Sequence, residues 1–226
     1  MMFKNLKLFF TSLIDSKNYH TLLLILLLSA DFIFIAVHCL NIYGVIGRNN
    51  LYSIVNENGY SEIFQYLKEF WVFIIMFHLF IKKKSISFLI WSLLFLYVLL
   101  DDSLTIHETF GEYLAKYFDL KPRFRLRGED YGELIVSFTV GGCFIAALIL
   151  AYLKSKTNIQ KISQHLFIFL LVLAFFGIFL DMVHVFYNDS HKLGLLEDGG
   201  EMLVMSFIMA YAFNLLNIIV VSKQVS

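Results

Sequence analysis

Three histidines in this chain each follow an aspartate within a largely apolar stretch. The pairs are Asp31 with His38, Asp101 with His107, and Asp181 with His184. Carboxylates and imidazoles without thiolates suit zinc, iron or manganese better than copper(I) or an iron–sulfur cluster. An aspartate can also orient a metal-binding histidine through the second nitrogen of its ring. The spacing therefore predicts a site for a divalent metal ion.

The predicted site combines these side chains with further carboxylates. We expect the metal ligands to be His38, Asp101, His107, Asp181, His184 and Glu197. In a mononuclear zinc hydrolase, a nearby glutamate acts as general base on the metal-bound water. We expect this catalytic role at Glu108, Glu133 and Glu201. A dinuclear carboxylate site is the alternative, because Asp181 and His184 have a spacing related to the Glu-x-x-His motif of such sites.

The remaining histidines and a run of arginines have simpler interpretations. A lone histidine on a transmembrane helix is more often a hydrogen-bonded interface residue than a ligand. We expect that role for His20, His78, His165 and His191. Pairing with the acidic residues Glu129 and Asp130 is the expected role of Arg123, Arg125 and Arg127, and binding of an anionic lipid or a substrate phosphate is the alternative.

The composition requires a membrane as the solvent for most of the chain. Of the 226 residues, 59% are hydrophobic, with 25 phenylalanines and one proline. A soluble domain of this length cannot bury so much apolar surface. The zero net charge and the scattered basic residues argue against nucleic-acid binding. We therefore expect membrane lipids as the surroundings, and a lipid or another amphiphile as a candidate substrate.

The apolar runs predict an all-α fold, a polytopic transmembrane bundle of about six helices. A transmembrane helix needs roughly 20 apolar residues. Such runs lie near 21–43, 63–81, 86–106, 134–153, 166–187 and 202–221. They form a single transmembrane domain over residues 21–222. Residues 1–20 alternate lysines with apolar side chains, which is typical of an amphipathic segment on the cytoplasmic surface.

Lysines in alternate loops predict the orientation of the chain. They precede the first span, separate the second from the third, and separate the fourth from the fifth. The positive-inside rule places these segments and both termini in the cytoplasm, and we expect a bacterial inner membrane. The loop between the third and fourth spans also carries basic residues, which acidic residues balance. Most ionisable residues of the spans then lie in the outer half, which predicts a polar site opening outward.

A short motif suggests an internal repeat. Residues 129–136 and 197–204 share the pattern E-D-x-G-E-x-x-V. Each copy is expected to open an inward-running helix, and each follows a span that ends in an aspartate and a histidine. The pattern predicts two parallel helical hairpins, with a fainter third copy near the N-terminus. Repeats of this kind place polar groups at a shared interface.

Several functions fit this pattern. The leading hypothesis is a metal-dependent membrane enzyme acting on a lipid or amphiphile, with hydrolysis favoured over oxidation at a di-metal site. An ion- or proton-coupled transporter or channel is the main alternative, because the same carboxylates would carry cations or protons. A haem-binding electron carrier with two axial histidines and a structural or assembly subunit are further alternatives. The sequence leaves open whether the protein is an enzyme.

Overall fold

The computed structural model describes residues 19–187 and 191–221, and the side chains of residues 19–187 and 192–216. The predicted amphipathic segment 1–20 lies outside this range, except for Tyr19 and His20, which belong to the first described helix. No β-strand occurs in the described ranges. The predicted all-α class is therefore confirmed.

The described elements are nearly all helices. They are α2 (Tyr19–Ile42), η1 (Asn50–Tyr52), α3 (Tyr60–Lys83), α4 (Ile86–Leu104), α5 (Ile106–Tyr117), α6 (Gly128–Leu153), α7 (Thr157–Ala174), the π-helical segment η2 (Phe175–Leu180), α8 (Asp181–Phe186) and α9 (His191–Val221). Helices α7, η2 and α8 continue one another as a single span. Six helices are thus long and apolar enough to cross a membrane, as expected of a multi-pass membrane protein.

Several helices begin before their predicted spans. Helix α6 begins at Gly128 rather than residue 134, and α9 begins at His191 rather than residue 202. Hydropathy alone misses these turns because they carry the acidic residues. The second E-D-x-G-E motif therefore lies inside α9, whereas the first opens α6, so the expectation that both copies open a helix is wrong for the second. The repeat itself stays a prediction.

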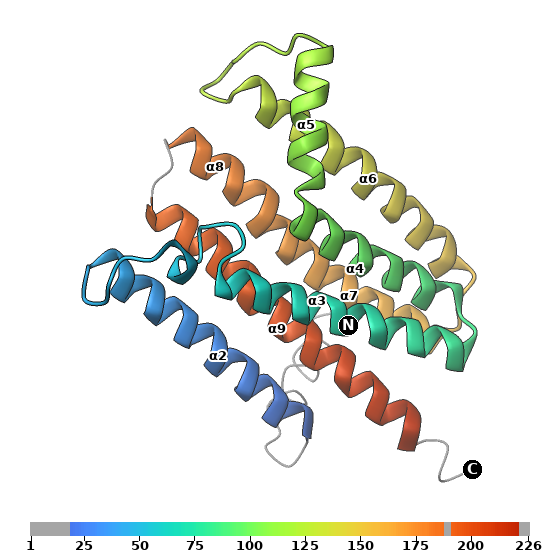
Figure 1. The fold of residues 1–226 in the computed structure, drawn as a ribbon. Coiled ribbons are helices and arrows are strands. Elements are labelled where there is room, and N and C mark those ends of the chain that lie inside the picture. The colour runs from blue at the N-terminus through green and yellow to red at the C-terminus, as the bar shows by residue number, and fades with distance from the viewer. Residues whose placement is uncertain (1–18, 188–190, 222–226) are drawn as a thin grey trace.

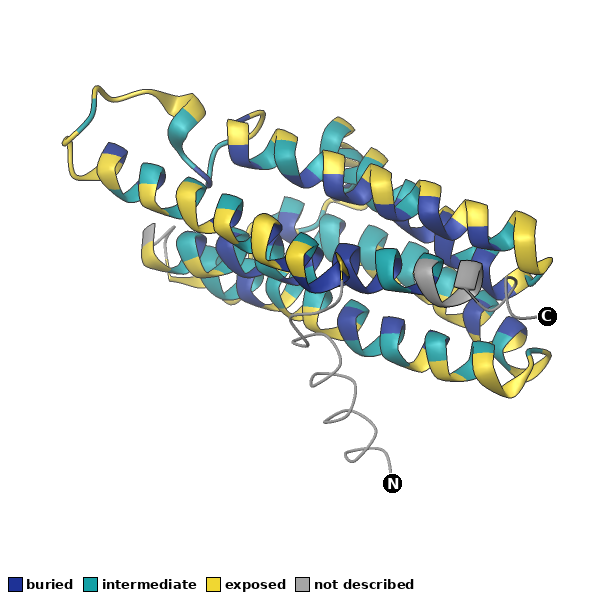
Figure 2. Cartoon of the chain, turned by 90° about the horizontal axis from the view of Figure 1, so that it is seen from below, coloured by how far each residue is buried: buried dark blue, intermediate teal, exposed yellow. Residues whose placement is uncertain are grey.

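The long helices run side by side, and α5 projects from one end of the bundle beside the start of α6 (Figure 1). Helix α9 is the central helix, since it packs against α2, α3, α7 and η2. Of its apolar stretch 67% is buried, against 11% for α6. Buried residues face the middle of the bundle and exposed residues run along its outer surfaces (Figure 2). Many of the exposed residues are large and apolar, as lipid-facing surfaces require.

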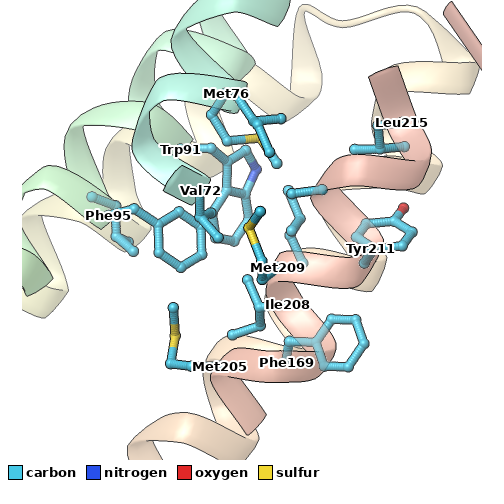
Figure 3. Packing of buried hydrophobic residues seen from close by; sticks show 14 of the residues in the cluster. Val72, Met76, Trp91, Phe95, Phe169, Met205, Ile208, Met209, Tyr211 and Leu215 are labelled. Carbon is cyan, nitrogen blue, oxygen red and sulfur yellow. The ribbon is translucent and has the colours of Figure 1, made fainter. Parts of the chain in front are cut away.

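The middle of the bundle is a dense apolar core formed by α3, α4, α7 and α9 (Figure 3). Its fully buried members include Val72, Met76, Trp91, Phe95, Met205 and Ile208. The one indole nitrogen in this core has a partner, because Trp91 Nε1 donates to Ser163 Oγ at 3.2 Å. In a membrane such packing holds helices together through van der Waals contact rather than through exclusion of water.

A fully buried ion pair ties α2, α3 and α9 together. Lys68 Nζ donates to Asp31 Oδ1 at 3.0 Å and to the Met202 carbonyl oxygen at 2.8 Å. Ser206 Oγ lies 3.3 Å from Lys68 Nζ and donates to Asp31 Oδ2. Neither charged side chain has any exposed surface. The charges of α2 and α3, which the membrane would otherwise reject, therefore neutralise each other inside the bundle.

Two glycines let α5 lie directly against α6. A Cβ atom on Gly132 would collide with the carbonyl group of Gly111, and one on Gly111 would lie 2.7 Å from the Glu133 backbone nitrogen. Backbone atoms cannot move aside as a side chain can. This close approach fixes the position of Glu133, the next residue of α6.

We predict that Lys68→Ala lowers the free energy of unfolding by about 3–5 kcal/mol, because it leaves Asp31 buried without its cation. Unfolding in mixed detergent micelles would measure the change. The double variant Lys68→Met, Asp31→Asn should recover most of the loss, since it removes both charges. Lys116→Ala is the control, because it breaks the exposed pair with Glu112 and should change nothing measurable. A similarly small effect of Lys68→Ala would contradict the role assigned to the pair.

Gly132→Ala should destabilise the protein by about 1–3 kcal/mol, the usual cost of overpacking. Gly141→Ala on the same helix is the matched control, because a Cβ atom there meets nothing within 4 Å. It should stabilise α6 by up to about 1 kcal/mol, the helix propensity gained from glycine to alanine. The same unfolding assay measures both changes. Equal effects of the two substitutions would show that α5 does not pack against α6 in this way.

Candidate functional site

A cavity of about 610 Å³ lies at the end of the bundle where α5 stands. Residues of α3, α4, α5, α6, η2, α8 and α9 line it. Its acidic lining residues are Glu57, Glu62, Glu69, Asp101, Asp102, Glu108, Glu112, Glu129, Glu133, Asp181, Glu197, Asp198 and Glu201. The basic residues in the same described lining are His107 and Arg127. The cavity is therefore strongly acidic.

Most of the predicted site residues share this cavity. The carboxylates expected to be catalytic, Glu108, Glu133 and Glu201, all belong to its lining. Of the predicted metal ligands, those in the lining are Asp101, His107, Asp181 and Glu197. A second cavity of about 60 Å³ between α6 and η2–α8 is also lined by His107, Glu133 and Asp181. The predicted site residues in this lining thus come from five helices, α4, α5, α6, α8 and α9.

Two of the predicted ligands are absent from the cavity lining. His38 faces the loop after α2, where the Ile54 backbone N–H donates to its Nδ1 at 3.1 Å. His184 contacts Glu197, with its Nδ1 2.8 Å from Glu197 Oε2. The spacing of residues in the sequence predicts neither contact, that of His38 with the loop at Ile54 or that of His184 with Glu197. His184 is therefore placed to orient Glu197, which does line the cavity.

His107 is held by Asp101 through two contacts. The backbone N–H of His107 donates to Asp101 Oδ1 at 2.9 Å, and its Nδ1 lies 3.1 Å from Asp101 Oδ2. The contacts form because the chain turns at Thr105, whose φ of 46° is left-handed and ends α4. The third span therefore stops at Leu104 rather than at residue 106. Asp101 can in this way cap the start of α5 while orienting the imidazole.

The acidic surroundings favour the charged form of His107, which lies between the spans. Burial opposes this charge, but the hydrogen bond and charge of Asp101, with Glu108 and Glu133, together raise the pKa of His107 to about 9. Burial and the charge of Glu57 raise the pKa of the neighbouring Glu108 above its usual value. At neutral pH His107 therefore carries a proton, which it must lose before it can bind a metal.

The arrangement of these side chains bears on the expected metal. Within residues 19–187 and 191–221, no group of three or more His, Cys, Asp or Glu side chains is gathered closely enough to hold an ion directly. The carboxylates are instead spread around a cavity much larger than one ion. Zinc, iron or manganese binding by the predicted ligands stays a prediction.

Glu69 is the residue that the sequence pattern did not single out. Its side chain is fully buried, it is the deepest lining residue of α3, and neither carboxylate oxygen accepts a hydrogen bond from a described donor. Gln65, one turn earlier, has an unpartnered Oε1 in the same lining. The signal was present in the low hydropathy at the start of this span, where charged residues interrupt an apolar helix.

Gly177, in the π-helical segment η2, leaves room in the site for the side chain of Glu201 from α9. A π-helical turn places one extra residue in the helix and is often found at functional positions. A Cβ atom on Gly177 of η2 would collide with Oε1 of Glu201. The missing side chain therefore leaves the room that this half-buried carboxylate occupies.

The remaining sequence predictions have mixed outcomes. Arg127 pairs with Asp130 through Nη2 at 2.8 Å, which confirms the expected pairing for that arginine. His165 Nδ1 lies 3.0 Å from the Tyr211 hydroxyl oxygen, in agreement with an interface role. His78 is exposed on the outer surface of α3. The side chain of His191 lies outside the described residues.

Comparison with known proteins gives a family for the chain. Residues 20–215 match the family described as a domain of unknown function, DUF8692. Because the match spans nearly all of the described helices, the chain belongs to this family. No curated protein and no solved structure matches it.

We predict that the pair of Asp101 and His107 makes stability depend on pH. The pKa of His107 rises from its ordinary 6.5 to about 9 on folding, so the stabilisation is complete below pH 6.5 and is lost as the pH rises through about 9. Unfolding measured from pH 6 to 10 should show this decline. His107→Gln should flatten the curve over that window, whereas His78→Gln, on the exposed face, should leave it unchanged. A curve of His107→Gln that parallels the unsubstituted protein would contradict the assignment.

Proposed function

We propose that the protein binds divalent metal cations, with part of their water shell, in the acidic cavity of its transmembrane bundle. The cations reach the cavity from the side of the membrane where α5 stands. The positive-inside distribution of lysines favours the outer side for this end. Binding and handling of a cation within the membrane is then the activity of the site.

The buried Glu69 carboxylate carries the proposal. A buried carboxylate costs several kcal/mol unless a partner compensates its charge. Among the described residues, Lys68 is the cation that acts on Glu69, and it is already bound to Asp31, Met202 and Ser206. The carboxyl groups of Asp102 and Glu201 repel Glu69, and that of Asp102 also lies close enough to share a hydrogen bond with it. Two carboxyl groups can bond to each other only through a shared proton. A cation or a proton between them is therefore the missing partner.

The donor atoms suggest the class of cation. Carboxylate and amide oxygens dominate the lining, and such hard ligands favour Mg²⁺, Ca²⁺ and Mn²⁺ over metals that prefer imidazole or thiolate. Manganese is the one among the metals expected from the sequence that suits this lining best. Because no three ligands converge closely among the described residues, an ion held here keeps several waters, as Mg²⁺ and Mn²⁺ commonly do.

The apolar core favours binding of a cation over its conduction in the conformation described. Below the cavity the bundle is filled by side chains such as Met76, Trp91 and Ile208. A hydrated ion cannot pass such packing. The site is therefore open at one end only, as expected of one state of a cation-coupled transporter or of a cation-dependent enzyme.

Hydrolysis of an amphiphile is a second candidate, favoured by the position of His107. Asp101 orients the imidazole through Nδ1, so Nε2 is the nitrogen that a substrate can reach. The smaller cavity between α6 and η2–α8 shares His107 and Glu133 with the main one. At neutral pH the protonated imidazole would act as a general acid, with a carboxylate such as Glu133 as base.

The test is calorimetric titration of the purified protein in lipid nanodiscs with Mn²⁺, Mg²⁺ and Ca²⁺. We expect saturable binding of Mn²⁺ that Glu69→Gln weakens by at least about ten-fold, because the loss of one charge–ion contact costs roughly 1.4 kcal/mol or more. Gly177→Ala should also weaken binding, since it displaces the Glu201 carboxylate. Asp119→Asn is the matched control, because this exposed carboxylate pairs with Lys121 outside the cavity.

Flux of the same ions into proteoliposomes separates the candidate activities. Uptake that depends on Glu69 would identify a transporter, and binding without uptake would leave the site catalytic or regulatory. The proposal fails if none of the three ions binds, or if Asp119→Asn weakens binding as much as Glu69→Gln does.

A further inference from the structure

A second large cavity lies at the opposite end of the bundle and has the opposite charge. It has a volume of about 920 Å³ and lies between α4, α6 and α7. Lys83, Lys84, Lys154 and Lys156 belong to its lining. The first two end α3, and the other two flank the short connection from α6 to α7. Four cations from two separate loops thus meet at one cavity.

These lysines have no acidic counterparts in the described structure. No carboxylate of the described residues lies within ion-pair distance of any of them. The sequence explains why, since no aspartate or glutamate occurs between Glu69 and Asp101, or between Glu133 and Asp181. No carboxylate of the described residues therefore balances the charge of this cavity.

Two helix N-termini add to the positive potential. Helix α4 begins at Ile86 and α7 begins at Thr157, and residues of both first turns line the cavity. Neither helix has a side chain that caps its first N–H groups. Free N–H groups at a helix start bind phosphate and similar anions. Lysines and helix starts that lack a side-chain cap together suit a phosphate group.

The rest of the cavity wall is apolar. Ile90 of α4 and Ala147 and Leu150 of α6 belong to the lining, and Leu150 is 62% exposed. A free phosphate ion would gain nothing from such a wall. A hydrocarbon chain would cover it, since the wall lies on helices that are long and apolar enough to cross the membrane.

We propose that this cavity binds one anionic phospholipid, such as phosphatidylglycerol. Its phosphate lies among the lysines and the starts of α4 and α7, and one acyl chain lies along Ile90, Ala147 and Leu150. Basic pockets between transmembrane helices recognise lipid headgroups in this way. The positive-inside distribution makes this the inner leaflet. The site is independent of the cation site, because the two cavities lie at opposite ends of the bundle.

Native mass spectrometry of the delipidated protein tests the proposal. Phosphatidylglycerol should form a one-to-one complex that phosphatidylcholine does not form. Lys84→Gln combined with Lys156→Gln should weaken this complex roughly thirty-fold, the loss expected from two lysines at an anionic headgroup. Lys82→Gln combined with Lys161→Gln is the matched control, because it removes the same charge from residues that do not line the cavity.

A further variant tests the acyl chain separately from the headgroup. Ala147→Phe keeps every lysine but fills the apolar wall, so it should weaken the phosphatidylglycerol complex. Thermal unfolding in phosphatidylcholine checks that each variant folds. Equal losses in the two lysine pairs, equal binding of phosphatidylcholine, or displacement of the lipid by inorganic phosphate at matched concentration would each overturn the proposal.

Discussion

The arrangement of the whole polar end depends on the buried ion pair of Lys68 and Asp31. It joins α2 to α3, and through the Met202 carbonyl oxygen it joins both to the central helix α9. Glu69 follows Lys68 in the chain and Glu201 precedes Met202, so the pair sets the position of the two deepest carboxylates of the cavity. The bundle neutralises the charges of Lys68 and Asp31, which hold it together. The carboxylate of Glu69, the residue next to Lys68, faces the cavity and accepts no hydrogen bond from a described donor.

Charge is separated along the bundle. Acidic residues line the cavity at the α5 end, unpaired lysines line the cavity at the other end, and a core of methionine, phenylalanine and tryptophan side chains lies between them. In the conformation described, this apolar layer separates the two cavities. The charge of each cavity suits ligands of the opposite charge, as the cation and lipid proposals require.

The spans and the shared acidic site were predictable, whereas the individual partners were not. Apolar runs predicted six helices that could cross a membrane, and placing Glu133, Asp181 and Glu201 at one depth predicted a shared polar region; all three residues line one cavity. His38 and His184 instead contact the loop at Ile54 and the side chain of Glu197. Such contacts depend on how a loop folds back and on which face a helix turns inward. Periodicity in one sequence does not determine either, and for the same reason Glu69 was missed.

The buried ion pair also has a consequence for how the protein is made. Helices α2 and α3 emerge from the ribosome one after the other, and each carries one charge of this pair, which insertion into a bilayer opposes by about 2.5–3.5 kcal/mol. If the two helices enter the membrane as a pair, each cancels much of the other's penalty. Two further hydrogen-bond partners of Lys68, the Met202 carbonyl oxygen and Ser206 Oγ, are supplied by α9, the last of the described spans along the chain. A chain in which α9 has not yet packed against α3 therefore holds a lysine that lacks two of its hydrogen bonds.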